Sequence, residues 1–177
     1  MLFCLYATGC LAQTNQGFEE AFIMTKQGDS IKGFVEVAPS YGSKIGYKKE
    51  VNDAQTFMST KEIKYILTPN RYLENITLGK REMLMTMISD GKVRLFLQVV
   101  SRASVRQSRF GPTAYESRDY VFVVKKGSIY TEVPRKNYKE MLSALLYECP
   151  EVVQKLREKV FAYEQMDLAV AEYNACQ

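Results

Sequence analysis

The chain of 177 residues contains no histidine and no tryptophan, and the first absence narrows the choice of function. Without histidine the protein cannot build a Ser-His-Asp triad, a Cys-His dyad or an imidazole metal site. The side chain that most often moves protons near neutral pH is also missing. Carboxylates, lysine and tyrosine can still carry acid–base chemistry. Whether the protein is an enzyme therefore stays open, and the composition weighs against it.

The sequence also lacks the short motifs that mark cofactor, metal and catalytic sites. It contains no GxxxxGK(S/T) or GxGxxG phosphate-binding loop, no CxxC and no HExxH. The 20 acidic residues are scattered, and no spacing selects an acid–base pair among them. We therefore expect no cofactor and no metal site, and we can assign no catalytic residue.

What is present is typical of one globular domain. The hydrophobic fraction is 46% and the charged fraction 25%, so the bulk of the chain should fold. A domain of this length can bury enough surface to need no metal or disulfide for folding. The net charge of +4 is small and dispersed, so we expect no nucleic-acid partner.

The first twelve residues, MLFCLYATGCLA, read as the end of a signal peptide. They carry no charge, and an apolar run is followed by small residues. Cys10 and Ala12 place small side chains where signal peptidase needs them for cleavage before Gln13. The basic region that begins a signal peptide is missing, so we expect the sequence to start inside a longer one. This interpretation predicts an exported protein, in the periplasm or at the cell surface, whose single domain covers 13–177.

Two other interpretations of this segment stay open. It can be a buried first strand, or it can belong to a lipoprotein, because Ala7-Thr8-Gly9-Cys10 partly matches a lipobox with Cys10 as the lipidated residue. A transmembrane helix is not expected, because twelve residues are too few to cross about 30 Å of hydrocarbon.

Cleavage after Ala12 would leave two cysteines, Cys149 and Cys176. Two such thiols often pair in an oxidising compartment, so we favour a disulfide between them. The alternative is a pair of unbonded small apolar residues, because the sequence does not give the distance that separates them.

The alternation of side chains predicts a β-rich part over 18–133. Turn residues at 27–29 and 89–92 separate alternating runs, which indicates hairpins and hence a mainly antiparallel sheet of about eight strands. Strands are expected, among others, over 93–100 and 119–124. Gly33 inside one strand indicates a bulge or a close backbone approach.

Over 134–177 the period changes to that of helices. Asn137 is the expected cap of one helix, Cys149-Pro150 the start of a second, and Met166 to Tyr173 the apolar face of a last one. The predicted fold is α+β: a mainly antiparallel sheet, curled or barrel-like, followed by two or three C-terminal helices. The sequence does not decide whether the sheet closes.

The stretch 101–117 is the least regular of the chain, and we interpret it as a long loop between two strands. Arginine holds phosphate or carboxylate through its planar fork, and long loops often serve binding. The stretch is thus a candidate site for an anionic glycan or a lipid head group, although a plain solvated loop explains it too. The candidate ligand-binding residues in and beside it are Arg102, Arg106, Arg109, Tyr115 and Arg118.

Both ends of the chain resemble a family of small secreted proteins of Bacteroidota. The run Gly28-Asp29-Ser30-Ile31-Lys32-Gly33 is similar to their GD(S/T)IxG hairpin. Those proteins also tend to have a Cys-Pro helix start and a terminal Tyr-Asn, which Cys149-Pro150 and Tyr173-Asn174 match, as does the Leu-Ala-Gln cleavage site. The resemblance implies export and the fold. It implies no catalytic residue, because the family has no assigned activity.

Three functional hypotheses follow. The leading one is an exported, non-catalytic module that binds or scaffolds in the bacterial envelope, with a glycan, a lipid head group or an envelope protein as partner. The alternative is a carboxylate-dependent hydrolase of envelope polymers, which requires two acidic groups that converge in a pocket. The third is a subunit of a larger envelope assembly.

Overall fold

The computed structural model describes residues 17–38, 41–109 and 111–176. The predicted signal segment 1–12, its cleavage site and Cys10 lie outside these residues. Export and lipidation therefore remain predictions.

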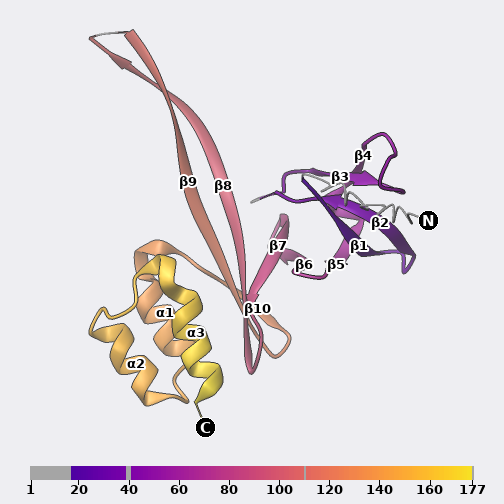
Figure 1. The fold of residues 1–177 in the computed structure, drawn as a ribbon. Helices are drawn as coiled ribbons and strands as arrows, with labels where there is room; N and C mark the ends of the chain where they lie inside the picture. Colours follow the sequence, from indigo (N-terminus) through magenta and orange to yellow (C-terminus); the bar gives the residue numbers. More distant parts are fainter. Residues whose placement is uncertain (1–16, 39–40, 110, 177) are drawn as a thin grey trace, which may run out of the picture.

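The described residues form one antiparallel sheet of ten strands, in the order β10-β9-β8-β7-β6-β5-β1-β2-β3-β4, and three α-helices that follow it (Figure 1). This arrangement confirms the α+β class and the C-terminal helices. The strands are β1 Phe18–Thr25, β2 Ser30–Glu36, β3 Lys44–Lys48, β4 Thr56–Ser59, β5 Ile63–Leu67, β6 Tyr72–Leu78, β7 Arg81–Ser89, β8 Val93–Ser108, β9 Gly111–Lys126 and β10 Ile129–Val133. The helices are α1 Tyr138–Leu145, α2 Pro150–Arg157 and α3 Met166–Ala175, with short 3-10 turns η1 Thr60–Glu62, η2 Arg135–Asn137 and η3 Tyr163–Gln165.

The sheet is open, so the barrel-like alternative is wrong. In the described residues β4 pairs only with β3 and β10 only with β9, which leaves both as edges. The sheet nevertheless curls, because Tyr130 of β10 donates a hydrogen bond to Glu74 of β6, four strands away in the order. The N-terminal strands share a second apolar cluster with Leu73 of β6 and Leu84 of β7.

The first hairpin confirms the predicted turn and explains Gly33. Gly28 takes a φ of +98°, a conformation that favours glycine. The β1–β2 register runs without a shift, so Gly33 marks a close approach and no bulge. A Cβ there would lie 2.4 Å from the Lys48 carbonyl oxygen and 2.6 Å from the ring of Tyr47. Tyr47 lies across the strand and donates a hydrogen bond to the Lys32 carbonyl at 3.0 Å.

The lower parts of β8 and β9 are buried on both faces. On one face they pack beneath the three helices, with Leu95 and Phe122 in the contact. On the other face Phe96 and Val123 pack with Ile76 of β6 and Met85 of β7. Two-sided burial makes this region the most constrained part of the sheet.

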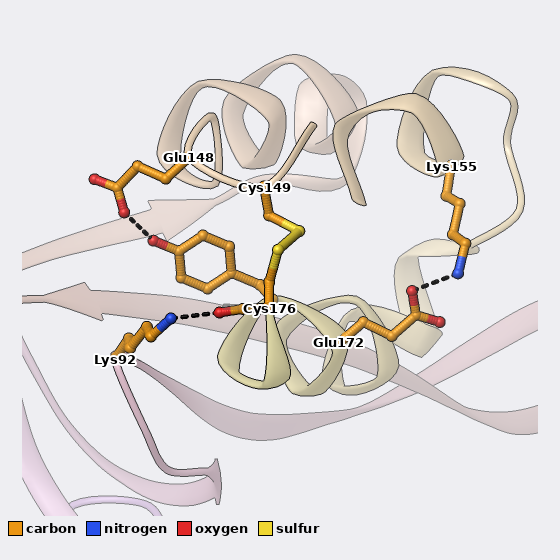
Figure 2. Close-up of a disulfide and its surroundings, with 7 residues drawn as sticks. Lys92, Glu148, Cys149, Lys155, Glu172 and Cys176 are labelled. Atoms are coloured by element: carbon orange, nitrogen blue, oxygen red, sulfur yellow. Dashed lines mark hydrogen bonds and ion pairs between the residues drawn. A yellow bond between two sulfur atoms is a disulfide. The ribbon is translucent and has the colours of Figure 1, made fainter. Parts of the chain in front are cut away.

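A disulfide between Cys149 and Cys176 ties the start of α2 to the end of α3, as predicted (Figure 2). Their Cα atoms lie 6.2 Å apart, within the usual range for a disulfide. Beside it Tyr173 donates a hydrogen bond to Glu148, and the Lys92 ammonium donates one to the Cys176 carbonyl (Figure 2).

The helix boundaries agree with the sequence in two respects and differ in one. Pro150 begins α2 directly after Cys149, as expected. Asn137 precedes α1, but its side chain makes no capping hydrogen bond. Within the residues that the structure describes, no helix is long and apolar enough to cross a bilayer.

Asn174 joins α3 to the turn between β7 and β8. Its Oδ1 accepts a hydrogen bond from the Val93 amide at 2.9 Å, and its Nδ2 donates to the Val93 carbonyl at 2.8 Å. The side-chain amide thus satisfies both backbone groups of one strand residue, as a neighbouring strand would. Gly91 in the turn has a φ of +152°, and a Cβ there would meet the Asn174 side chain at 2.6 Å.

Candidate binding site: the β8–β9 arm

The stretch 101–117 is part of two paired strands, so its interpretation as a loop is wrong. β8 and β9 each contain 16 residues, far beyond the expected 93–100 and 119–124. Among the described residues, no layer of helix or sheet covers this part, so the apolar alternation that signals a half-buried strand is missing. The pairing between two distant stretches keeps it extended.

We call residues 98–121 the arm, because Figure 1 shows them projecting away from the rest of the molecule. Pairing with β7 ends at Leu97 and pairing with β10 ends at Phe122. Beyond these residues β8 and β9 pair with each other, from Gln98↔Val121 to Ser108↔Gly111. Both outer edges of the arm pair with no other strand in the described chain.

The side chains along one face of the arm are exposed, as expected for a ribbon that pairs with no further strand of the described chain. Along β8, Ser101, Ala103, Val105 and Gln107 are all exposed, Val105 at 70%. Pro112 follows the turn in β9, and a proline fits a strand where its missing N–H serves no neighbour. The arm is therefore a two-stranded ribbon with solvent along its edges.

The predicted ligand residues are spread along this ribbon. Arg102 lies opposite Ser117, Arg106 opposite Thr113, and Tyr115 opposite Ser104. Arg118 lies opposite Ser101, in the other phase of the strands, and Arg109 is in the turn. At the rise of a strand, Arg102 and Ser108 lie about 20 Å apart along the ribbon, and Arg109 follows in the turn. The set is therefore spread over a greater length than one small anion occupies.

The arm carries a net positive charge. Its residues include four arginines and two carboxylates, Glu116 and Asp119, a formal charge of 4 − 2 = +2, compared with +4 for the whole sequence. A projecting ribbon with this charge attracts extended polyanions and anionic surfaces from a distance.

The root of the arm is fixed to the N-terminal strands. Gln98 Nε2 donates a hydrogen bond to the Tyr41 carbonyl at 3.2 Å. Tyr41 is 5% exposed, and its hydroxyl donates to the Glu36 carbonyl at 3.0 Å and accepts from Arg71 Nη1 at 2.9 Å. A hollow of about 220 Å³ lies at this junction, between Tyr41 and the first residues of the arm.

A half-buried ionic cluster braces the sheet below the arm. Lys125 of β9 lies 3.2 Å from Glu74 Oε1, and Tyr130 donates a hydrogen bond to the same carboxylate. Burial alone would lower the pKa of Lys125, but hydrogen bonds to Tyr130 and Glu74 raise it above the ordinary value. Burial, and then the hydrogen bond to Glu74, raise the pKa of Tyr130. Burial and the Glu74 charge raise the pKa of Tyr72 to about 12.

This cluster holds a protonated lysine and two neutral phenols around one carboxylate at neutral pH. Such an arrangement braces β6 against β9 and β10. Sequence reasoning missed it, and missed the Gln98–Tyr41 contact as well, because partners more than fifty residues apart leave no local pattern. Among the described residues, no group of three or more cysteine or acidic side chains is placed to hold a metal ion.

Comparison with known proteins finds no matching family model, no matching curated protein and no matching solved structure.

Proposed function

We propose that the protein is an exported, non-catalytic module of the bacterial envelope that binds an extended anionic partner along the β8–β9 arm. The observation that carries this proposal is the spacing of the arginines. They are strung along a projecting ribbon, which suits a glycan chain or a layer of lipid head groups better than a small ligand. The periplasm or the cell surface is the proposed location.

The distribution of carboxylates gives less support to the hydrolase alternative. A hollow of about 610 Å³ between α1 and α2 has one acidic lining residue, Glu140, and the adjoining hollow of about 450 Å³ is lined without any. Glu74 is half-buried, but its described neighbours are Lys125 and tyrosines. A pair of converging carboxylates is what that mechanism needs.

The proposal is tested with a variant that lacks the arm. The pairs Gln98↔Val121 and Ser108↔Gly111 are ten residues apart on each strand, so their side chains lie on the same faces of the ribbon. Residues 99–120 can therefore be replaced by Asn-Gly without a change of register. Sedimentation with phosphatidylglycerol vesicles and retention on alginate measure binding to a lipid surface and to an acidic glycan. We expect the native chain to bind at least one of them, and the shortened variant to bind at least tenfold more weakly.

The matched control separates the arm from general charge. Alanine at all four arm arginines should weaken binding as the deletion does. Alanine at four exposed lysines elsewhere, Lys32, Lys49, Lys61 and Lys80, changes the net charge by the same amount and should have little effect. If the native chain binds neither probe, or if the lysine variant loses as much affinity as the arginine variant, the proposal is wrong.

A further inference from the structure

A second surface, between α1 and α2, is independent of the arm. The hollows of about 610 Å³ and 450 Å³ share Ser143 and Arg157, so they form one continuous groove, which we call the α1–α2 groove. Lys139, Arg157 and Lys159 line one half of it. Tyr147, Pro150 and Val153 line the other half. The first half thus holds three basic side chains and one carboxylate, Glu140. The second half combines the Tyr147 ring, Pro150 and Val153 with the amide of Gln154.

The three basic residues of the groove have no ion-pair partner among the described residues. Elsewhere in the helical part Lys126 pairs with Glu148, Arg135 with Glu164 and Lys155 with Glu172. Lys139, Arg157 and Lys159 pair with no carboxylate within the described ranges, and Lys139 is half-buried there. With Glu140 as the one acidic lining residue, the groove keeps an excess of positive charge, and an anion bound there would reduce the repulsion among the basic groups.

The backbone at Lys159 adds an independent observation. α2 ends in a Schellman motif, with the Val160 amide bonded to the Lys155 carbonyl at 3.0 Å and the Lys159 amide bonded to the Leu156 carbonyl at 3.2 Å. Lys159 takes the left-handed position of this motif, with a φ of +64°, where glycine is the usual residue. The chain therefore keeps a strained lysine at the groove instead of a relaxed glycine, a pattern found at ligand clamps.

Ser143 supplies the neutral polar group of the groove. Its Oγ is buried and has no hydrogen-bond partner among the described residues, although buried hydroxyls normally have one. Rotation about χ1 redirects such a hydroxyl toward a ligand in the groove.

We infer that the α1–α2 groove binds a ligand that carries a phosphate or carboxylate group on an apolar or ring-shaped body. The anionic group contacts Lys139, Arg157 and Lys159, and the body lies against Tyr147 and Val153. Arginine and lysine recognise phosphate and carboxylate through charge-assisted hydrogen bonds, and an aromatic ring offers flat contact area to a sugar or an acyl chain.

The test is a titration of the full-length, ¹⁵N-labelled chain with inorganic phosphate, hexyl phosphate and glucose 1-phosphate, followed by amide chemical shifts. We expect the organic phosphates to shift amides near Ser143 and Arg157, and to bind more tightly than inorganic phosphate. Stronger binding of hexyl phosphate indicates a lipid source for the natural ligand, and stronger binding of glucose 1-phosphate indicates a sugar source. Equal affinity for all three probes overturns the assignment of the apolar half.

Variants locate the site. Lys139→Ala with Arg157→Ala should weaken binding about tenfold or more, as the loss of charge-assisted contacts requires. Lys136→Ala is the matched control, because Lys136 is an exposed lysine nearby that does not line the groove.

Lys159→Gly relieves the left-handed strain, so it should raise the melting temperature while it weakens binding. A loss of affinity in a more stable variant cannot be a folding defect. If Lys136→Ala weakens binding as much as the groove variants, or if Lys159→Gly binds as tightly as the native chain, the inference is wrong. The variant without the arm should bind these phosphates unchanged.

Discussion

Single side chains connect distant parts of this molecule. Asn174, near the end of α3, satisfies both backbone groups of Val93 and also donates from Nδ2 to the Asp90 carbonyl at 3.3 Å. Gly91 leaves the space that this contact needs. The turn between β7 and β8 is therefore completed by a residue more than eighty positions later, and not by its own sequence alone.

We predict that Asn174→Ala lowers the free energy of unfolding by about 1–3 kcal/mol, because it leaves partly buried backbone groups without partners. Asn174→Asp keeps the acceptor for the Val93 amide and loses the donor, so its effect should be intermediate. Urea unfolding followed by circular dichroism measures both. Asn52→Ala, at an exposed position, should change stability by less than about 0.5 kcal/mol. A loss no larger than that for Asn174→Ala would show that the contact contributes little.

At the scale of elements, the three short helices depend on each other and on the disulfide. α1 and α2 contain eight residues each and α3 contains ten. Helices of that length are marginal alone in water, so packing on the sheet and the link from Cys149 to Cys176 must hold them.

We predict that Cys149→Ala with Cys176→Ala lowers the free energy of unfolding by about 3 kcal/mol, since the link closes a loop with a sequence separation of 27 residues. Thermal unfolding of the native chain with and without a reductant should give a comparable difference. A thiol count on unreduced, denatured protein is the direct check. Two free thiols would contradict the disulfide.

The sequence predicts the elements whose patterns are local and misses those that depend on remote partners. Turn residues around Gly28 and Gly91 give the hairpins, and helical spacing after Pro134 gives the helices. β4 carries four residues with no alternation and was not expected. The arm lacks a sequence signal for strands, because its pairing joins two stretches that no neighbouring layer buries in the described residues. The binding role of the candidate arginines stays a prediction, and their linear arrangement follows only from the register.

At the scale of the whole molecule, the curl of the sheet depends on a few ionisable groups. Glu74 holds Lys125 and Tyr130 across the curl, and Tyr72 Oη lies 3.5 Å from Glu74 Oε2. The pKa of Tyr72 is raised to about 12 in the folded protein, first by burial and then by the Glu74 charge. In the unfolded chain the pKa of a tyrosine is about 10.

Between about pH 10 and about pH 12, Tyr72 keeps its proton in the folded state and loses it in the unfolded state. The free energy of unfolding must therefore fall as the pH rises through this range. Below about pH 10 the stabilisation is fully present. We predict that Tyr72→Phe reduces this alkaline loss, as measured by urea midpoints at about pH 9 and about pH 11.5. Tyr147→Phe, at a position 67% exposed, is the control and should keep the full loss. Equal alkaline losses in the two variants would contradict the assignment to Tyr72.

The packing of the helices over β8, β9 and β10 also sets the order in which a newly made chain can fold. Leu95, Phe122 and Val124 are synthesised before the helices that cover them, and Tyr173 of α3 belongs to the same cluster. Until α3 has left the ribosome, this apolar face has nothing to pack against and offers itself to chaperones. The core on the helix side of the sheet is therefore completed only when the last helix of the chain has been made.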